Sequence, residues 1–189
     1  MKKSKENFRY KYLKSFNIEN IKKLVKNISK EEWLLDQSRQ NEYPAHKKTN
    51  TFMLADLDNI FNWEIGSLYK PNIINNNSEL WKSILPIINF LEKTHNGKHG
   101  RIILPKLFAN CEIPNHVDGG DYLDVVRRNH IPIITNSNVF FCFDEEKINM
   151  KEGEIWEINN MKNHSVINNS DFDRIHLIID VIPKQYITL

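Results

Sequence analysis

Apolar residues recur at helical spacing in the first part of the chain. Between residues 18 and 28 they fall every three or four positions, which predicts an amphipathic helix with Asn17 as its cap. Ser29 stands three residues before Glu32, a capping-box pattern that predicts a second short helix. A third helix is predicted near residues 78–94, where we expect Pro86 either to kink it or to divide it in two.

The pattern changes at about residue 99. From there the apolar stretches are short, rich in β-branched and aromatic residues, and separated by Gly, Asn and Asp, which predicts a run of strands joined by turns. The stretch TNTFMLADL, at residues 49–57, predicts another strand. Helices followed by short strands predict a mainly β fold, an antiparallel sandwich or small barrel with flanking helices packed outside. Jelly-roll and cupin-like barrels belong to this class, and their open mouth is a usual place for a small-molecule site.

Length and composition are those of a globular protein. The 189 residues are 40% hydrophobic and 26% charged, and they contain neither an internal repeat nor a Pro- or Gly-rich linker. We therefore expect one domain over residues 1–189. Its first part, residues 1–50, is expected to be helical, and residues 51–189 are expected to form the β core with the helix near 78–94 inserted.

Charge and cysteine content narrow the possible partners. The net charge of +2 gives no electrostatic case for a nucleic acid or an anionic membrane, and the Lys-rich stretches before residue 30 predict a solvated helix face. No apolar run approaches the roughly 20 residues of a membrane helix, and the start of the chain lacks the apolar stretch of a signal peptide. Two cysteines without paired spacing exclude a disulfide framework, so we expect a cytoplasmic protein of unknown oligomeric state.

A histidine and an aspartate stand two positions apart in the segment NHVDGG, residues 115–120. At the end of a strand, His116 and Asp118 would project from one face and converge on one point. Gly119 and Gly120 would let the chain turn away without a Cβ crowding that point. Such a pair also occurs in ordinary polar loops, so a metal-binding interpretation requires a third ligand.

His164 is the candidate for that third ligand. It follows a polar turn far along the chain and begins a predicted strand. Two histidines and one carboxylate from two separated strands form a facial triad, which leaves three coordination positions open and suits non-heme Fe(II) oxygenases.

Arg174 opens an apolar strand and shares one face of it with His176, Ile178 and Asp180. An arginine pointing into a barrel mouth is costly unless it meets an anion. A planar guanidinium binds a carboxylate through two parallel hydrogen bonds, which lysine does not do equally well. Arg174 is therefore a candidate anchor for an anionic co-substrate.

These segments together resemble the aspartyl/asparaginyl β-hydroxylase family of Fe(II)- and 2-oxoglutarate-dependent oxygenases. The resemblance rests on His116, the Arg-x-His pair of Arg128 and His130, the segment EGEIWEINN, His164, and Arg174 at the family's separation from that histidine. It implies a double-stranded β-helix (a jelly roll) with iron near its open end. It also implies that Arg174 holds the distal carboxylate of 2-oxoglutarate, with Arg128 and His130 as further co-substrate contacts.

The resemblance implies a dioxygenase that uses O2 and hydroxylates an amino acid or an amino-acid side chain, with succinate and CO2 as co-products. The best-known animal members carry glycine where this chain has Asp118. The complete triad is similar to that of the bacterial amino-acid hydroxylases of the same superfamily.

Polar residues around these motifs have less specific interpretations. Asn168 either orients a ligand histidine or lies on the surface, and Asp180 either pairs with a nearby cation or packs at a rim. Arg127 is expected to be the solvated neighbour of Arg128. Arg39 and His46 could touch substrate, but a polar loop between helix and strand is the favoured interpretation.

Two other classes of function remain open. A cupin-like metal-binding or isomerase protein would use the same three ligands without oxygen chemistry, although it has no need of Arg174. A basic adaptor would bind an acidic protein through the Lys-rich N-terminal region, with the barrel as its support.

Overall fold

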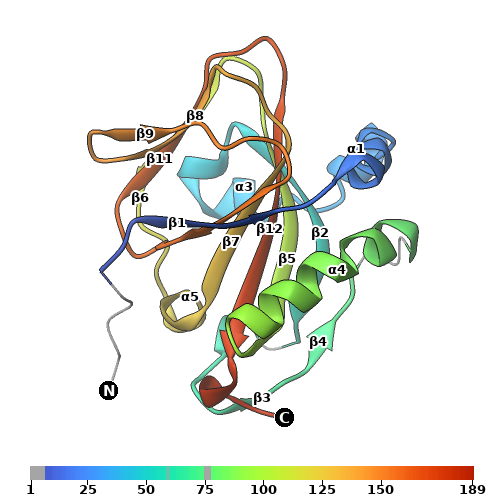
Figure 1. The fold of residues 1–189 in the computed structure, drawn as a ribbon, viewed down its shortest axis with the longest axis vertical. Helices are drawn as coiled ribbons and strands as arrows, with labels where there is room; N and C mark the ends of the chain where they lie inside the picture. The colour runs from blue at the N-terminus through green and yellow to red at the C-terminus, as the bar shows by residue number, and fades with distance from the viewer. Residues whose placement is uncertain (1–6, 59, 75–77) are drawn as a thin grey trace.

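The computed structural model describes residues 7–58, 60–74 and 78–189, and two antiparallel sheets pack against each other in it (Figure 1). In order, the larger sheet contains β1 (Tyr10–Ser15), β10 (Glu154–Ile158), β7 (Arg127–Ile134), β12 (Arg174–Pro183), β5 (Gly97–Leu107), β2 (Thr49–Leu57) and β4 (Pro71–Asn72). The smaller sheet contains β6 (Cys111–His116), β11 (His164–Asn168), β8 (Val139–Phe143) and β9 (Glu146–Ile148). A short parallel pair joins β13 (Ile187–Thr188) to β3 (Ser67–Leu68). The predicted mainly β, antiparallel architecture is confirmed.

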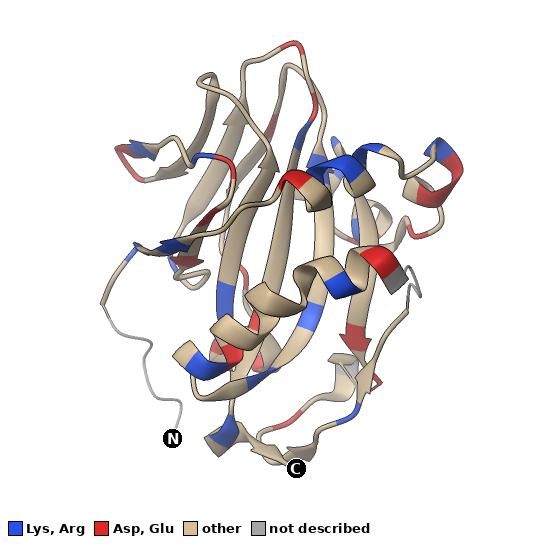
Figure 2. Ribbon diagram, turned by 45° about the vertical axis from the view of Figure 1, so that its right-hand side comes forward, with Lys and Arg blue, Asp and Glu red and all other residues tan. Residues whose placement is uncertain are grey.

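Three helices pack on the outer face of the larger sheet: α1 (Glu19–Lys26), α2 (Lys30–Trp33) and α4 (Ser78–Thr94). The remaining helical elements are α3 (Ser38–Glu42), α5 (Asp121–Val125) and the 3-10 turns η1 (Pro44–His46), η2 (Ile60–Asn62) and η3 (Lys184–Tyr186). The main apolar core joins α1 and α4 to one face of the larger sheet. No helix within the described ranges is long and apolar enough to span a membrane. Lys and Arg are interspersed with Asp and Glu along these elements (Figure 2).

The capping box predicted at Ser29 and Glu32 is formed in both directions. The N-cap of α1 is Ile18 and not the predicted Asn17, although Asn17 Oδ1 accepts a hydrogen bond from the N–H of Glu19 at 3.0 Å. Pro86 neither divides nor ends α4, which runs unbroken from Ser78 to Thr94. Pro86 lies on the exposed side, where water can reach the carbonyl that its missing N–H leaves free.

The N-terminal region differs from its prediction, because it begins with a strand. Residues 1–6 lie outside the described residues, but 10–15 form β1, which pairs with β10 and is itself the edge strand of the larger sheet. A register shift between Tyr12 and Lys14 disrupts the alternation that would have identified a strand. Both Tyr10 and Tyr12 pack on Trp156 of β10, with ring centroids 5.8 and 5.5 Å apart, so aromatic cross-strand contacts fix β1 in place.

Strand β12 separates the apolar core from a polar interior. Its residues Ile175, Leu177, Ile179 and Val181 belong to the core under the helices. The alternate positions are occupied by Arg174, His176, Ile178 and Asp180, and all four are buried as well. Apolar side chains of both sheets close part of the space between the sheets. The polar face of β12 is therefore buried inside the barrel.

Candidate functional site

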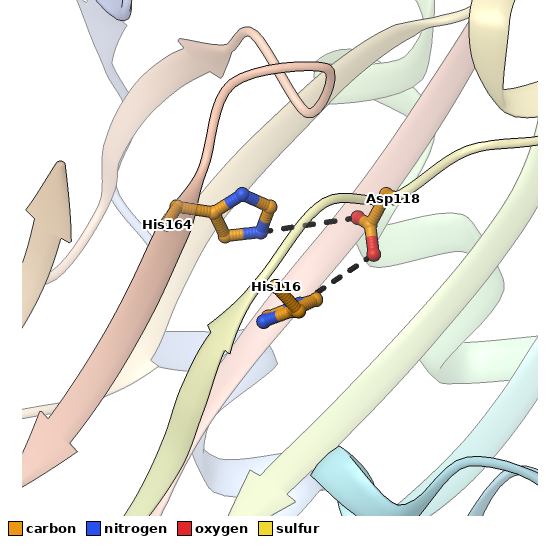
Figure 3. Close-up of side chains that lie close together, drawn as sticks. All are labelled: His116, Asp118 and His164. Carbon is orange, nitrogen blue, oxygen red and sulfur yellow. Dashed lines mark ion pairs between the residues drawn. The ribbon is translucent and has the colours of Figure 1, made fainter. Parts of the chain in front are cut away.

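His116 and His164 lie opposite each other on neighbouring strands of the smaller sheet. They are register partners in the antiparallel pair of β6 and β11, and their ring centroids are 4.3 Å apart (Figure 3). Strand pairing alone thus brings together two histidines that are distant in sequence.

Asp118 completes this cluster from the turn after β6. Its Oδ1 lies 3.5 Å from Nε2 of His116, and its Oδ2 lies 4.0 Å from Nε2 of His164. The three potential ligand atoms all lie within 4.8 Å of one another, which is compact enough to hold a metal ion. Asn160 fixes the turn, since its carbonyl accepts from the N–H of Asp118 and its side chain donates to the carbonyl of Asp118.

The two glycines after Asp118 have a different role from the one expected. A Cβ at either Gly119 or Gly120 would meet nothing within 4 Å, so crowding does not require glycine here. Gly120 instead has φ +119°, a conformation that side chains with L configuration rarely adopt, and it leads directly into α5. The requirement for glycine at this position therefore comes from the backbone.

Each histidine of the cluster is oriented by a backbone carbonyl. Nδ1–H of His116 donates to the carbonyl of Pro114, and Nδ1–H of His164 donates to that of Lys162, both at 2.8 Å. These bonds leave the lone pair of each Nε2 directed at the cluster. A carbonyl partner on the far nitrogen is the usual arrangement for a metal-ligating histidine.

Arg128 provides the positive charge beside Asp118. Its Nη1 donates to Asp118 Oδ2 at 2.5 Å, while its Nε and Nη2 donate to the buried carboxylate of Asp180 at 2.9 and 2.8 Å. Burial acts to raise the pKa of Asp118, but Arg128, His164, His116 and Arg39 together outweigh it and hold that pKa well below its usual range. Of the two interpretations of Asp180, pairing with a cation is the one observed.

Arg174 lies deeper in the barrel and lacks such a counter-ion. Its side chain is fully buried, and its Nη2 donates to Nδ1 of His176 at 2.7 Å. No carboxylate among the described residues pairs with it, and its Nε has no hydrogen-bond partner there. Burial lowers the pKa of Arg174 to about 9.

Two histidines beside Arg174 also have unsatisfied ring nitrogens. Nε2 of His176 and Nδ1 of His130 are buried without a partner in the described part of the chain, and the two rings lie 5.7 Å apart. Burial lowers the pKa of both histidines well below the ordinary value, so both rings are neutral. Buried polar atoms without partners are rare in folded proteins, and several around one guanidinium indicate a ligand-binding position.

The cluster lies between an outer pocket and an inner cavity. The outer pocket has a volume of about 250 Å³, and the inner cavity, of about 40 Å³, reaches Arg174 and His130. Because about 10–15 Å³ already admits a water molecule, the inner cavity has room for a small polar group such as a carboxylate. Both are bordered by His116, Asp118 and Arg128, so the cluster is accessible from either side.

Arg39 and His46 form part of this site, which their interpretation as a polar loop missed. Both border the outer pocket and the inner cavity. Nη2 of Arg39 donates to Nε2 of His46 at 3.0 Å, and the His46 ring lies 5.8 Å from that of His116. Burial, followed by the charge of Arg39, lowers the pKa of His46 to about 3, so the ring is neutral.

Two further polar residues lie elsewhere. Arg127 is directed away from Arg128 and pairs with Glu157 at 3.0 Å. Asn168 is neither on the surface nor a partner of His164. It is buried, and its side chain donates to the carbonyls of Phe108 and Phe172, so it fixes the loop before β12.

Comparison with protein families gives a match to the model of the aspartyl/asparaginyl beta-hydroxylases over residues 15–183. Comparison with curated protein sequences gives no significant match.

Solved structures share the fold at low sequence identity. The viral collagen prolyl hydroxylase of Paramecium Bursaria Chlorella virus-1, in its 2OG complex, gives a TM-score of 0.61 at 9% identity over 93% of this chain and 97% of that one. A prolyl-4-hydroxylase of Pseudomonas putida gives 0.58 at 8% identity over 94% of each chain. A Trichoplax adhaerens prolyl hydroxylase, in complex with a hypoxia inducible factor peptide fragment, gives 0.56 at 8% over 95% and 86%. These similarities establish the fold and agree with the expected jelly roll.

Proposed function

Because this chain belongs to the aspartyl/asparaginyl β-hydroxylase family, we propose that it is an Fe(II)- and 2-oxoglutarate-dependent hydroxylase of an amino acid or an amino-acid side chain. His116, Asp118 and His164 bind the iron in this proposal. Arg174 binds the distal carboxylate of 2-oxoglutarate, and Arg128 and His130 are its further contacts.

The ligand set suits iron of this kind. Two imidazoles and one carboxylate on one side of a metal leave the other positions open, as in non-heme Fe(II) oxygenases. Both imidazoles present Nε2 to the cluster, and Asp118 remains ionised beside Arg128, so its carboxylate has the form that metal binding requires.

The main support for this proposal is the buried guanidinium of Arg174, which has no carboxylate partner among the described residues. A buried arginine without a carboxylate is costly, and a ligand carboxylate removes that cost through two charge-assisted hydrogen bonds. The unsatisfied nitrogens of His130 and His176 add polar contacts at the same place. A dicarboxylic 2-oxo acid that reaches from the candidate metal site to Arg174 would give partners to the polar groups of Arg174, His130 and His176.

The bound iron and co-substrate supply the oxidation, in which O2 and 2-oxoglutarate yield succinate, CO2 and a hydroxylated product. The protein's own residues fix the geometry. Backbone carbonyls hold the two imidazoles, Asn160 holds the turn of Asp118, and the apolar side chains of Ile113, Phe141 and Val166 border the inner cavity and limit the access of water. The positioning of substrate in the outer pocket then decides which C–H bond is oxidised.

Succinate release from 2-oxoglutarate is the direct test. Purified protein with Fe(II), ascorbate and 2-oxoglutarate is followed by proton NMR, first alone and then with candidate amino acids. We expect slow succinate formation without substrate and faster formation with it. Metal binding without any 2-oxoglutarate turnover would instead support the cupin-like metal-binding alternative.

A further inference from the structure

The arginines of this chain divide into two groups by their partners. Four of the six pair with carboxylates: Arg9 with Asp144 and Glu146, Arg101 with Asp56, Arg127 with Glu157, and Arg128 with Asp118 and Asp180. Arg39 and Arg174 have no ion-pair partner among the carboxylates of the described residues. Both border the inner cavity beside the three candidate metal ligands. The site therefore contains two cationic groups that form no ion pair with a carboxylate of the described residues.

The neutral partners of Arg39 hold its guanidinium without neutralising it. Nη1 donates to Oγ1 of Thr51 at 3.3 Å, and Nη2 donates to Nε2 of neutral His46 at 3.0 Å. Arg39 comes from α3, and His46 comes from η1, which follows it directly. Two contacts to separate elements restrict the guanidinium before any ligand arrives, which reduces the entropy lost on binding.

Under the proposed function, neither carboxylate of 2-oxoglutarate binds Arg39. 2-Oxoglutarate has two carboxylates, and under the proposed function one lies at the metal and the other at Arg174. Arg101 and Arg128, which also border the outer pocket, are already paired. Arg39 is therefore available to pair with a third carboxylate, and the remaining ligand of the site is the substrate.

We propose that Arg39, positioned by His46 and Thr51, binds a carboxylate of the substrate, so that the hydroxylated molecule carries a carboxylate group. The outer pocket, at about 250 Å³, lies below the usual range of about 300–1,000 Å³ for ligand pockets and suits a group the size of one amino acid. That carboxylate belongs either to a free amino acid or to an acidic side chain. This inference rests on the proposed function and specifies its substrate class.

A panel of candidate substrates distinguishes the carboxylate of a free amino acid from that of an acidic side chain. Succinate release is measured with the standard L-amino acids, with their C-terminal amides, and with blocked tripeptides that carry Asp or Asn at the centre. We expect stimulation by at least one free acid and at least tenfold less by its amide. Stimulation by the Asp peptide, but not by the Asn peptide, assigns the carboxylate to a side chain. Equal stimulation by acids and amides, or none by any carboxylate compound, overturns the inference.

Substitution of Arg39 separates substrate binding from co-substrate binding. Arg39→Gln should raise the KM for the stimulating carboxylate by about 10- to 100-fold, the size expected for losing charged hydrogen bonds. The KM for 2-oxoglutarate should change far less than the KM for the stimulating carboxylate. Arg9→Gln, which removes an exposed arginine outside the site, is the matched control. A raised 2-oxoglutarate KM with an unchanged substrate KM would assign Arg39 to the co-substrate and overturn the inference.

His46 is a positioning residue in this proposal. His46→Gln keeps an acceptor for Arg39, whereas His46→Phe removes it. We expect the second variant to raise the substrate KM with little change in kcat, and the first to restore most of the difference. Equal effects of the two variants would reject the orienting role. Absence of succinate from the wild-type protein would instead reject the proposed function itself, so the two failures are distinguishable.

Discussion

His116 and His164 face each other across an antiparallel strand pair, and each donates its Nδ1–H to the carbonyl two residues before it. The same local arrangement thus occurs on two strands, with both Nε2 atoms presented to Asp118. Because strand register sets the separation of the rings, the cluster is preorganised by the sheet, and each ring needs only a local bond to orient it.

Removing either imidazole should abolish metal binding without unfolding the protein. For His164→Ala we expect loss of bound Fe(II) and of succinate formation, with an unchanged far-ultraviolet circular dichroism spectrum, because β11 also pairs with β8 through its backbone. Metal content after loading and desalting measures the effect. His99→Ala is the control, since His99 bonds Glu92 outside the site and should retain iron. Wild-type metal content in His164→Ala would exclude His164 as a ligand.

Replacing Arg174 with methionine should separate stability from co-substrate binding. Methionine fills similar space without a buried charge, so the ligand-free protein should be as stable as the wild type or more stable. The rise in melting temperature that 2-oxoglutarate gives the metal-loaded wild type should disappear, because a ligand stabilises only the state that binds it. Differential scanning calorimetry with and without 2-oxoglutarate provides both readouts. A retained ligand-induced shift would contradict the assignment of the distal carboxylate to Arg174.

The alternation on β12 could be predicted from sequence because it depends only on the period of a strand. That period placed Arg174, His176 and Asp180 on one face, and the structure buries all three together. The position of the helices outside the sheet also followed from pattern, since α1 and α4 each bury one apolar face.

Features that depend on the three-dimensional path of the chain could not be predicted from the sequence. Strand β1 was missed because its register shift breaks the alternation and its pairing depends on Trp156, which is far away in sequence. Arg39 and His46 have no periodic signal, and the course of α3 and η1 over the pocket brings them to the cluster. The signal available was an arginine and a histidine close together in a segment with few apolar residues, and that is common in surface loops.

Buried neutral histidines should make the metal-free protein sensitive to acid. The pKa values of His130 and His176 lie well below the ordinary value, mainly because of burial. Below the unfolded pKa of about 6.5 the unfolded chain therefore binds more protons than the folded one. Stability should fall as the pH decreases, by up to about 1.4 kcal/mol per pH unit for each ring.

Urea unfolding at several pH values between about 7 and about 5 measures this slope. His176→Gln keeps an acceptor for Arg174 but cannot be protonated, so its slope should be less steep by the contribution of one proton. The difference between variant and wild type removes the effect of carboxylates, which is common to both. Equal slopes would mean that His176 becomes charged while the protein is folded.

Asp180 should affect both stability and metal affinity through Arg128. Asp180→Asn removes the charge that Nε and Nη2 of Arg128 contact and leaves this buried guanidinium with Asp118 alone. Breaking a buried ion pair costs roughly 3–5 kcal/mol, and the double variant Arg128→Met/Asp180→Asn should recover much of that loss. Urea unfolding of Asp180→Asn, Arg128→Met and the double variant measures the coupling between the two residues.

The effect of Asp180 on metal affinity follows from competition for one carboxylate. A guanidinium that has lost Asp180 is held more strongly by Asp118, so a metal ion must displace a stronger partner and should bind more weakly. Isothermal titration calorimetry with Mn(II) measures this change in Kd. Asp56→Asn is the matched control, because it breaks the ion pair with Arg101, which does not contact Asp118. It should lower stability and leave the metal Kd unchanged, and a similar Kd increase in both variants would attribute the effect to general destabilisation.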